Sequence, residues 1–169
     1  MATTYKAIAT VEVGSGGAAN IEFTSIPSTY TDLYLVTSLR SDRASTQDGL
    51  TLEFNGSAAN FTRREITGSG SAASSSSASN AFAGNIDAAN ATTSTFSNQQ
   101  IYIPNYAGSN NKSYSADSVE ENNATAAYAV LVAGLWSQTA AINRVTLKSD
   151  NAANFVQYST ATLYGIKNS

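Results

Sequence analysis

The amino-acid sequence predicts an all-β fold, an antiparallel, jelly-roll-like β-sandwich of about eight to ten strands. Apolar and polar residues alternate in short runs, as over residues 50–54, where Leu50, Leu52 and Phe54 share one face of a strand. Glycine, asparagine and proline separate most of these runs. No stretch carries a sustained apolar stripe with the 3.6-residue period of a helix. Two packed sheets, each with one face in water, accommodate this pattern.

Ten segments are the expected strands. In chain order they are 5–13, 20–24, 32–40, 50–54, 60–66, 95–103, 113–119, 127–134, 141–148 and 161–166. Turn residues flank them, such as the glycine-rich 14–17, Pro27 after the second strand and Asn55-Gly56 after the fourth. The alanine-rich stretch 117–131 also permits a turn or two of helix, an alternative that composition alone supports.

The chain is expected to form a single domain over residues 1–169, with a thin core. Leu, Ile, Val and Phe contribute 32 residues, about a fifth of the chain, whereas Ala contributes 28. Gly68 to Ala81 is a low-complexity Ser/Ala/Gly segment that we expect to be a loop. We favour a mobile surface loop, and the alternative is an arm that becomes ordered against a neighbouring subunit.

The composition excludes several function classes. The chain has no Cys and no His, so it lacks disulfides, thiol nucleophiles, and the histidine of the common catalytic triads. Its nine basic residues are scattered and its net charge is −3, which argues against a nucleic-acid partner. The longest apolar run, 126–136, is too short for a membrane span, and no leader sequence is expected. We therefore expect a protein that is not an enzyme and needs no cofactor.

Acidic clusters are the remaining candidates for chemistry. Asp117, Glu120 and Glu121 lie close together in sequence, and paired carboxylates suffice for glycoside hydrolysis. Asp42 and Asp48 suggest a calcium site, but the segment between them lacks the ligand spacing of a calcium-binding loop. We interpret both groups as solvated loop charges, with a structural calcium ion at Asp42 and Asp48 as the alternative. The single tryptophan, Trp136, is expected in the core rather than on a sugar-binding surface.

Arginine side chains are frequent in protein–protein interfaces, because the planar guanidinium donates several hydrogen bonds to carboxylates and carbonyls. The expected partner contacts are Tyr5, Arg40, Arg43, Arg63 and Arg64. The alternative for the arginines is pairing within the chain, with the nearby acids Asp42, Asp48 and Glu65.

Seven short motifs, in this order, are spread over nearly the whole chain. They are Ile21–Leu33 (IEFTSIPSTYTDL), Leu39–Arg43 (LRSDR), Phe54-Asn55-Gly56, Asn60-Phe61, Tyr106–Lys112 (YAGSNNK), Gly134-Leu135-Trp136 and Leu163–Ile166 (LYGI). On these motifs the sequence resembles a family of tailed-bacteriophage virion proteins, common in phages of cyanobacteria and other aquatic bacteria. The resemblance implies a capsid decoration (cement) protein or the tip of a head or tail fibre. The motifs are turns and core segments, and none of them carries catalysis.

Between these two roles we favour a decoration protein, because the first expected strand begins within about five residues of Met1, with no preceding shaft. The expected partners are the major capsid protein and further copies of this chain, with a trimer favoured over a dimer. The expected location is the capsid surface of a virion, after synthesis in the host cytoplasm. The alternative is a receptor-binding fibre tip that recognises a glycan of the host surface.

Overall fold

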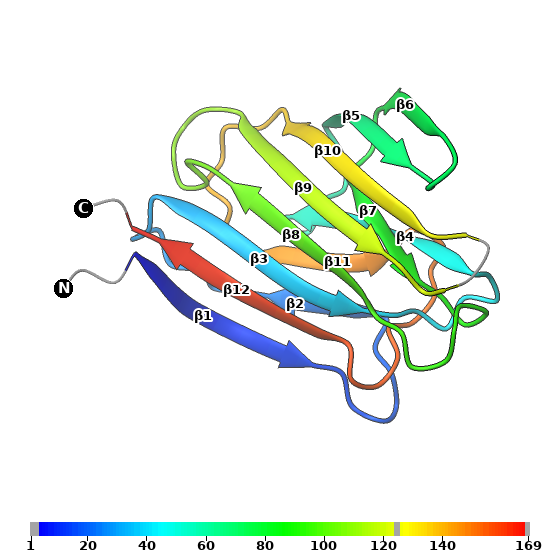
Figure 1. Cartoon of the computed structure of the whole chain (residues 1–169). Helices are drawn as coiled ribbons and strands as arrows, with labels where there is room; N and C mark the ends of the chain where they lie inside the picture. The colour runs from blue at the N-terminus through cyan, green and yellow to red at the C-terminus, as the bar shows by residue number, and fades with distance from the viewer. Residues whose placement is uncertain (1–3, 124–125, 168–169) are drawn as a thin grey trace.

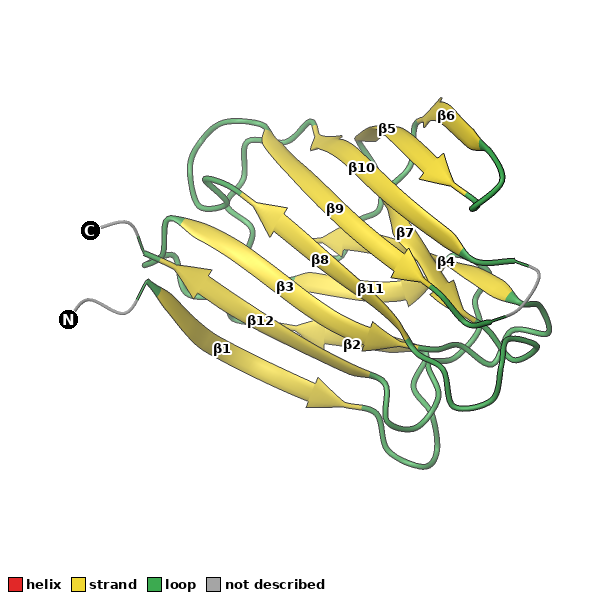
Figure 2. Ribbon diagram, viewed as in Figure 1, coloured by secondary structure: helices red, strands yellow, loops and turns green. Residues whose placement is uncertain are grey.

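The computed structural model describes residues 4–123 and 126–167 and shows an all-β sandwich. Twelve strands form two antiparallel sheets that pack face to face, with the larger sheet in front of the smaller one in Figures 1 and 2. The described residues contain no helix, and hence none with the length and apolarity of a membrane span. The predicted antiparallel sandwich is confirmed, with twelve strands rather than eight to ten.

The larger sheet contains eight strands. Its order is β1 (Tyr5–Glu12), β12 (Thr160–Ile166), β3 (Asp32–Leu39), β8 (Ser97–Ile103), β9 (Lys112–Glu120), β10 (Tyr128–Trp136), β5 (Phe61–Gly68) and β6 (Ala73–Ala78). The smaller sheet contains β2 (Asn20–Phe23), β11 (Val145–Ser149), β4 (Gln47–Phe54) and β7 (Phe82–Asp87), in that order. All of these strand pairs are antiparallel.

The period-two alternation of the sequence decides which side chains enter the core. Along β8 and β9 every second residue is buried, so one face of each strand packs on the smaller sheet and the other faces away from it. Aromatic rings close one end of the core, where Phe54 lies 5.5 Å from Trp136 between ring centroids. Trp136 is 3% exposed, which confirms its predicted place in the core.

Two strands were missed by the alternation pattern. β6 lies within the segment 68–81 that was expected to be a loop, and it pairs with β5 from Arg63↔Ala78 to Gly68↔Ala73. Strand pairing needs only backbone groups, so an exposed serine run forms a strand without an apolar face. β7 is buried on both faces over much of its length and therefore shows no alternation.

The helix considered over 117–131 is wrong for the described residues of that stretch, 117–123 and 126–131. This stretch contains the end of β9 and the beginning of β10, which pair with each other from Tyr128↔Glu120 to Trp136↔Lys112. Alternate side chains such as Ser118 and Val130 are buried there, and this strand packing overrides the helix propensity of alanine.

Candidate functional site

The side of the larger sheet that faces away from the smaller sheet, here called the outer face, carries few charges. On the described strands from β12 to β6, two exposed outward-facing residues are charged, Asp117 and Arg64, and a third charged residue on this face, Asp32, is buried. Large apolar side chains are exposed on the same face, among them Ile66 (60%) and Leu131 (57%). An exposed face of this composition is typical of a binding surface.

A groove crosses the outer face over β10, β5 and β6. It consists of two adjoining hollows of about 470 and 550 Å³ that share Arg64. We call it the Arg64 groove. Its lining includes Arg64, Ile66, Ser75, Ser77, Leu131 and Leu135.

Strand register builds this groove. Ile66 lies opposite Leu131 on one side and Ser75 on the other, while Arg64 lies between Ala133 and Ser77. Directly opposed side chains in an antiparallel pair are about 4.5–5.5 Å apart, so each row forms one continuous strip. The small side chains of Ala133 and Ser77 leave space on both sides of Arg64. Beside this space, the side chains of Ile66 and Leu131 form an apolar surface, here called the apolar floor.

Arg64 differs from its neighbour Arg63 because successive residues of a strand face opposite ways. Arg63 points to the inner side, where it pairs with Glu65, donates to Asn80 Oδ1 at 2.6 Å and lies 4.4 Å from the centre of the Phe82 ring. The ion pairs among the described residues do not include Arg64, which is exposed on the outer face. Arg64 therefore presents an unneutralised cation beside an apolar floor.

The other expected contact residues are placed differently. Arg40 is 9% exposed, and its guanidinium donates to backbone carbonyls of residues 89–95, including Thr92 O at 2.8 Å and Ala91 O at 3.1 Å. These carbonyls of the same chain therefore occupy the guanidinium of Arg40. Arg43 pairs within the chain, with Asp48 at 3.7 Å and with the carbonyl of Gln47 at 3.1 Å.

Tyr5 belongs to a second feature of the outer face, a tyrosine patch formed by Tyr5, Tyr34, Tyr102 and Tyr164. Tyr34 lies opposite both Tyr164 and Tyr102 in the strand register, and the Tyr5 ring meets the Tyr34 ring edge-on at 6.0 Å. The patch offers aromatic faces and hydroxyls at the surface. The sequence contains a pattern that predicts most of this patch. Along their strands Tyr34, Tyr102 and Tyr164 alternate with buried apolar residues, so they are expected on the face that points away from the core.

Hydrogen bonds hold two of these hydroxyls in place. Tyr34 donates to Gln100 Oε1, and Tyr102 donates to Asp32 Oδ2 at 2.8 Å. The bond to Asp32, followed by burial, raises the pKa of Tyr102 above its usual value. Burial likewise raises the pKa of Tyr34. Both phenols are therefore neutral at physiological pH and present polar but uncharged groups.

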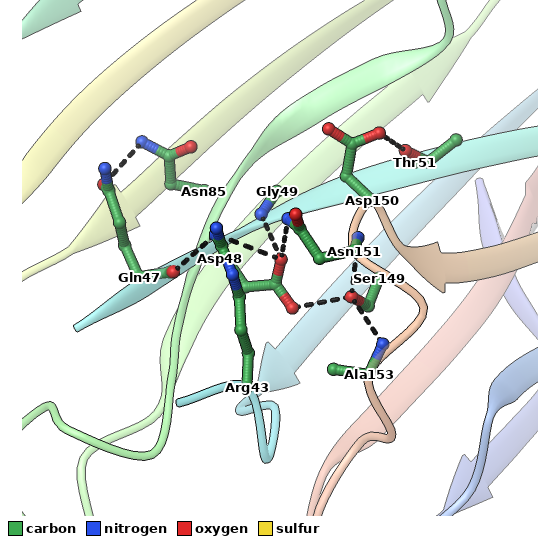
Figure 3. A network of polar contacts seen from close by, with 10 residues as sticks. All are labelled: Arg43, Gln47, Asp48, Gly49, Thr51, Asn85, Ser149, Asp150, Asn151 and Ala153. Carbon is green, nitrogen blue, oxygen red and sulfur yellow. Dashed lines mark hydrogen bonds and ion pairs between the residues drawn. The ribbon is translucent and has the colours of Figure 1, made fainter. Parts of the chain in front are cut away.

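The aspartate considered for calcium, Asp48, is fully engaged by protein donors (Figure 3). Its Oδ1 accepts from Gly49 N at 2.9 Å and Asn151 Nδ2 at 2.7 Å, and its Oδ2 accepts from Ser149 Oγ at 2.6 Å. Arg43 adds a positive charge beside it. The network ties the beginning of β4 to the loop after β11, so Asp48 acts as a structural acceptor.

The other candidate acids do not converge on one cleft. Asp42 accepts from the backbone and side chain of Asn154, Asp117 faces outward, and Glu121 accepts from Asn123 N at 2.8 Å. Within the described part of the chain, no group of three or more acidic, histidine or cysteine residues is arranged to hold a metal ion.

Glu120 instead forms a buried pair with Asp87, at the ends of β9 and β7. Asn122 Nδ2 donates to both carboxyls, at 2.7 Å to Asp87 Oδ1 and 3.3 Å to Glu120 Oε1. Both acids are 1% exposed. Burial, followed by the negative charge of Asp87, raises the pKa of Glu120 to about 9. Glu120 is therefore protonated and neutral at neutral pH, and the pair of acids carries one negative charge instead of two.

Comparisons with known proteins assign no family. No family model matches the sequence, and no curated protein matches it. Among solved structures, the crystal structure of the galectin LEC-6 of Caenorhabditis elegans is similar, at 10% sequence identity and a TM-score of 0.32. The likeness covers 94% of this chain and 96% of that chain. A likeness at this level assigns neither a family nor a ligand to the chain.

Proposed function

We propose that this chain is a non-enzymatic virion protein of a tailed bacteriophage that decorates the capsid, and that it docks on the major capsid protein through the Arg64 groove. The observation that carries the proposal is the outer face, on which aliphatic side chains and one unneutralised arginine lie exposed together. The resemblance of the sequence motifs to phage virion proteins supports the choice of partner.

The physical basis of docking is desolvation of the apolar floor. Ile66 and Leu131 are more than half exposed, and covering them removes apolar surface from water at roughly 25 cal/mol per Å². Arginine at the centre of a contact provides several donors for carbonyls or a carboxylate of the partner. The partner surface should therefore combine an apolar ridge with an acidic or carbonyl-rich edge.

Docking on an assembled shell would stabilise that shell by mass action. A protein that binds the assembled capsid and not its free subunits stabilises the assembly by RT ln(1 + [L]/Kd) per site, where [L] is the free concentration of that protein. Most side chains on the rest of the outer face are neutral. Contact over that face therefore removes few charged groups from water, and the free-energy cost of their desolvation is small.

The copy number per particle tests the proposal. Quantitative mass spectrometry of purified virions would compare this chain with the major capsid protein. A decoration protein is present in hundreds of copies, in fixed ratio to the shell subunits. A handful of copies per particle would contradict capsid decoration.

The tyrosine patch favours a second candidate, recognition of a host-surface glycan by a fibre tip. Tyr5 and Tyr34 present ring surface, and Gln100 beside them adds a side-chain amide, a combination that suits sugar stacking and hydrogen bonding. The test is binding of the purified protein to host cells, compared with Tyr5→Ala. Loss of cell binding in this variant would support the fibre tip, and no binding by the wild type would contradict it.

A further inference from the structure

Strand β6 ends the larger sheet, and one of its two edges pairs with β5. Figure 1 shows it at the corner of the molecule, continuing the sheet beyond β5. Its sequence, Ala73–Ala78 (ASSSSA), contains no charge, no proline and no register shift. Natural sheets usually protect such an edge with one of these features, so an unprotected edge points to a strand partner.

The other three sheet edges are protected. β1 carries Lys6 and Glu12 and a register shift between Ala7 and Ala9. β2 has four residues, and Glu22 within it is engaged by Arg144. These two edges therefore have the usual features that discourage strand addition.

The free edge of β7 is covered by side chains of the larger sheet. Ser118 Oγ bonds both the N–H and the carbonyl of Asn85, and Tyr114 donates to the carbonyl of Phe82 at 2.9 Å. Ser97 Oγ accepts from Asp87 N. Among the described residues, no side chain provides such bonds to the backbone of β6.

We propose that β6 pairs with β6 of a second copy of this chain, antiparallel and about a two-fold axis, to form a closed dimer. A two-fold axis places each residue opposite its own kind, so a charged edge would repel itself, whereas serine and alanine meet without clash or repulsion. Pairing of β6 with β1 of another copy would instead be head-to-tail and would propagate as an open filament.

Hydrogen-bond alternation identifies the residues of β6 that remain free. Ser69 N donates to Ala72 O at 2.9 Å across the turn, which makes this a hydrogen-bonded pair. Because bonded and non-bonded pairs alternate, residues 74, 76 and 78 bond to β5, and residues 73, 75 and 77 direct their N–H and C=O groups to the free edge. The other side of β5 agrees, since Ser137 N donates to Asn60 O at 2.8 Å and the same alternation continues along β10.

This alternation determines the register of the dimer. A two-fold axis perpendicular to the sheet pairs odd residues with odd residues, and centring it on Ser75 pairs Ser75 with Ser75 of the second copy and Ala73 with Ser77. This register forms about six backbone hydrogen bonds between the copies, more than the alternative centred on Ser76.

The same axis leaves both outer faces on one side of the dimer. The two Arg64 residues are then three strand spacings apart across the sheet and four residues apart along it, roughly 20 Å in all, which exceeds the screening length of about 8 Å at physiological salt. The dimer thus presents two Arg64 grooves on the same side and binds a repetitive surface with higher avidity than the monomer. This last consequence rests on the proposed capsid docking, whereas the dimer itself does not. A two-fold contact also favours a dimer over the trimer expected from the sequence.

Disulfide trapping in purified protein tests the register, because the chain has no cysteine of its own. Ser75→Cys should cross-link to itself under mild oxidation, since opposed Cα atoms of a hydrogen-bonded pair are about 5.5 Å apart. The matched control is Ser74→Cys, one residue earlier and also exposed, which should cross-link at least about tenfold less by itself. A mixture of Ser74→Cys and Ser76→Cys should cross-link, because these residues are opposed across the axis.

A second variant removes the contact without a cross-link. Ser75→Pro deletes an N–H that points to the free edge and leaves the bonds to β5 in place. Sedimentation should show a concentration-dependent dimer for the wild type and a monomer for Ser75→Pro, with unchanged thermal unfolding of the monomer. Equal cross-linking of Ser74→Cys and Ser75→Cys, or a wild type that stays monomeric while Ser75→Cys fails to cross-link, would overturn the proposal. These measurements use no capsid, so their outcome is independent of the docking proposal.

Discussion

Gly134 lies directly opposite Tyr114 in the β9–β10 pair, and the tyrosine ring occupies the space that a side chain at Gly134 would need. A Cβ at this glycine would come within 2.0 Å of ring carbons of Tyr114. The ring is buried against Phe54, and its hydroxyl donates to the carbonyl of Phe82 at 2.9 Å. This glycine therefore allows the two sheets to be joined by a buried phenol.

Gly134→Ala should destabilise the fold by about 2–3 kcal/mol, because the ring has backbone-bonded and packed neighbours and cannot move aside freely. Chemical denaturation measures the change in the free energy of unfolding. Gly16→Ala is the matched control, since a Cβ there has no atom within 4 Å. Equal stability of the two variants would contradict this account of the β9–β10 pair.

Lys112→Met should destabilise the fold by about 3 kcal/mol, although methionine fits the volume. The ammonium of Lys112 is buried and donates to the carbonyls of Gly108 at 2.7 Å and Thr139 at 3.3 Å, and also to that of Asn110. Methionine leaves these carbonyls without a donor. Thermal unfolding measures the effect, with exposed Lys6→Met as control. A Lys112→Met variant as stable as Lys6→Met would show that the ammonium is dispensable.

Stability should fall as the pH rises from about 4.5 towards 9, because Glu120 holds a proton in the folded state that it releases when unfolded. Its contribution is complete below the unfolded pKa and is lost as the pH rises through the folded pKa. One such proton accounts for at most about 1.4 kcal/mol per pH unit.

Glu120→Gln is the test of this pH dependence. Glutamine resembles the protonated acid, so the variant should unfold at higher denaturant concentration than the wild type at pH 8 and should show a flatter profile between pH 5 and pH 9. Urea unfolding across this range measures both. Parallel profiles for the two proteins would mean that Glu120 does not carry the proton.

The sequence predicted the sandwich because alternation directly encodes a sheet with one wet face, as Leu50, Leu52 and Phe54 show in β4. It did not predict β6, because a serine run has no apolar face and its pairing is a property of backbone groups alone. β7 was missed for the opposite reason, since Ala83 and Ile86 are buried and its polar Asp87 is buried as well.

The candidate site was predicted in part. Alternation places Arg63 and Arg64 on opposite faces of β5, but it does not say which of them faces the core. The structure assigns the exposed position to Arg64 and the intramolecular pair to Arg63. The apolar floor forms only because β5 pairs with β10, two strands that are far apart in the chain. The alternation of residues within one strand does not predict which distant strand it pairs with.

Binding of the purified protein to capsid shells assembled from the phage's major capsid protein tests the central claim most directly. The comparison is between wild type, Arg64→Glu in the groove, and Lys6→Glu, an equal charge change on the exposed far edge of the same sheet. The account predicts that Arg64→Glu weakens binding by at least about tenfold, which corresponds to about 1.4 kcal/mol, and that Lys6→Glu binds like the wild type. Wild-type affinity in Arg64→Glu would contradict docking through the Arg64 groove.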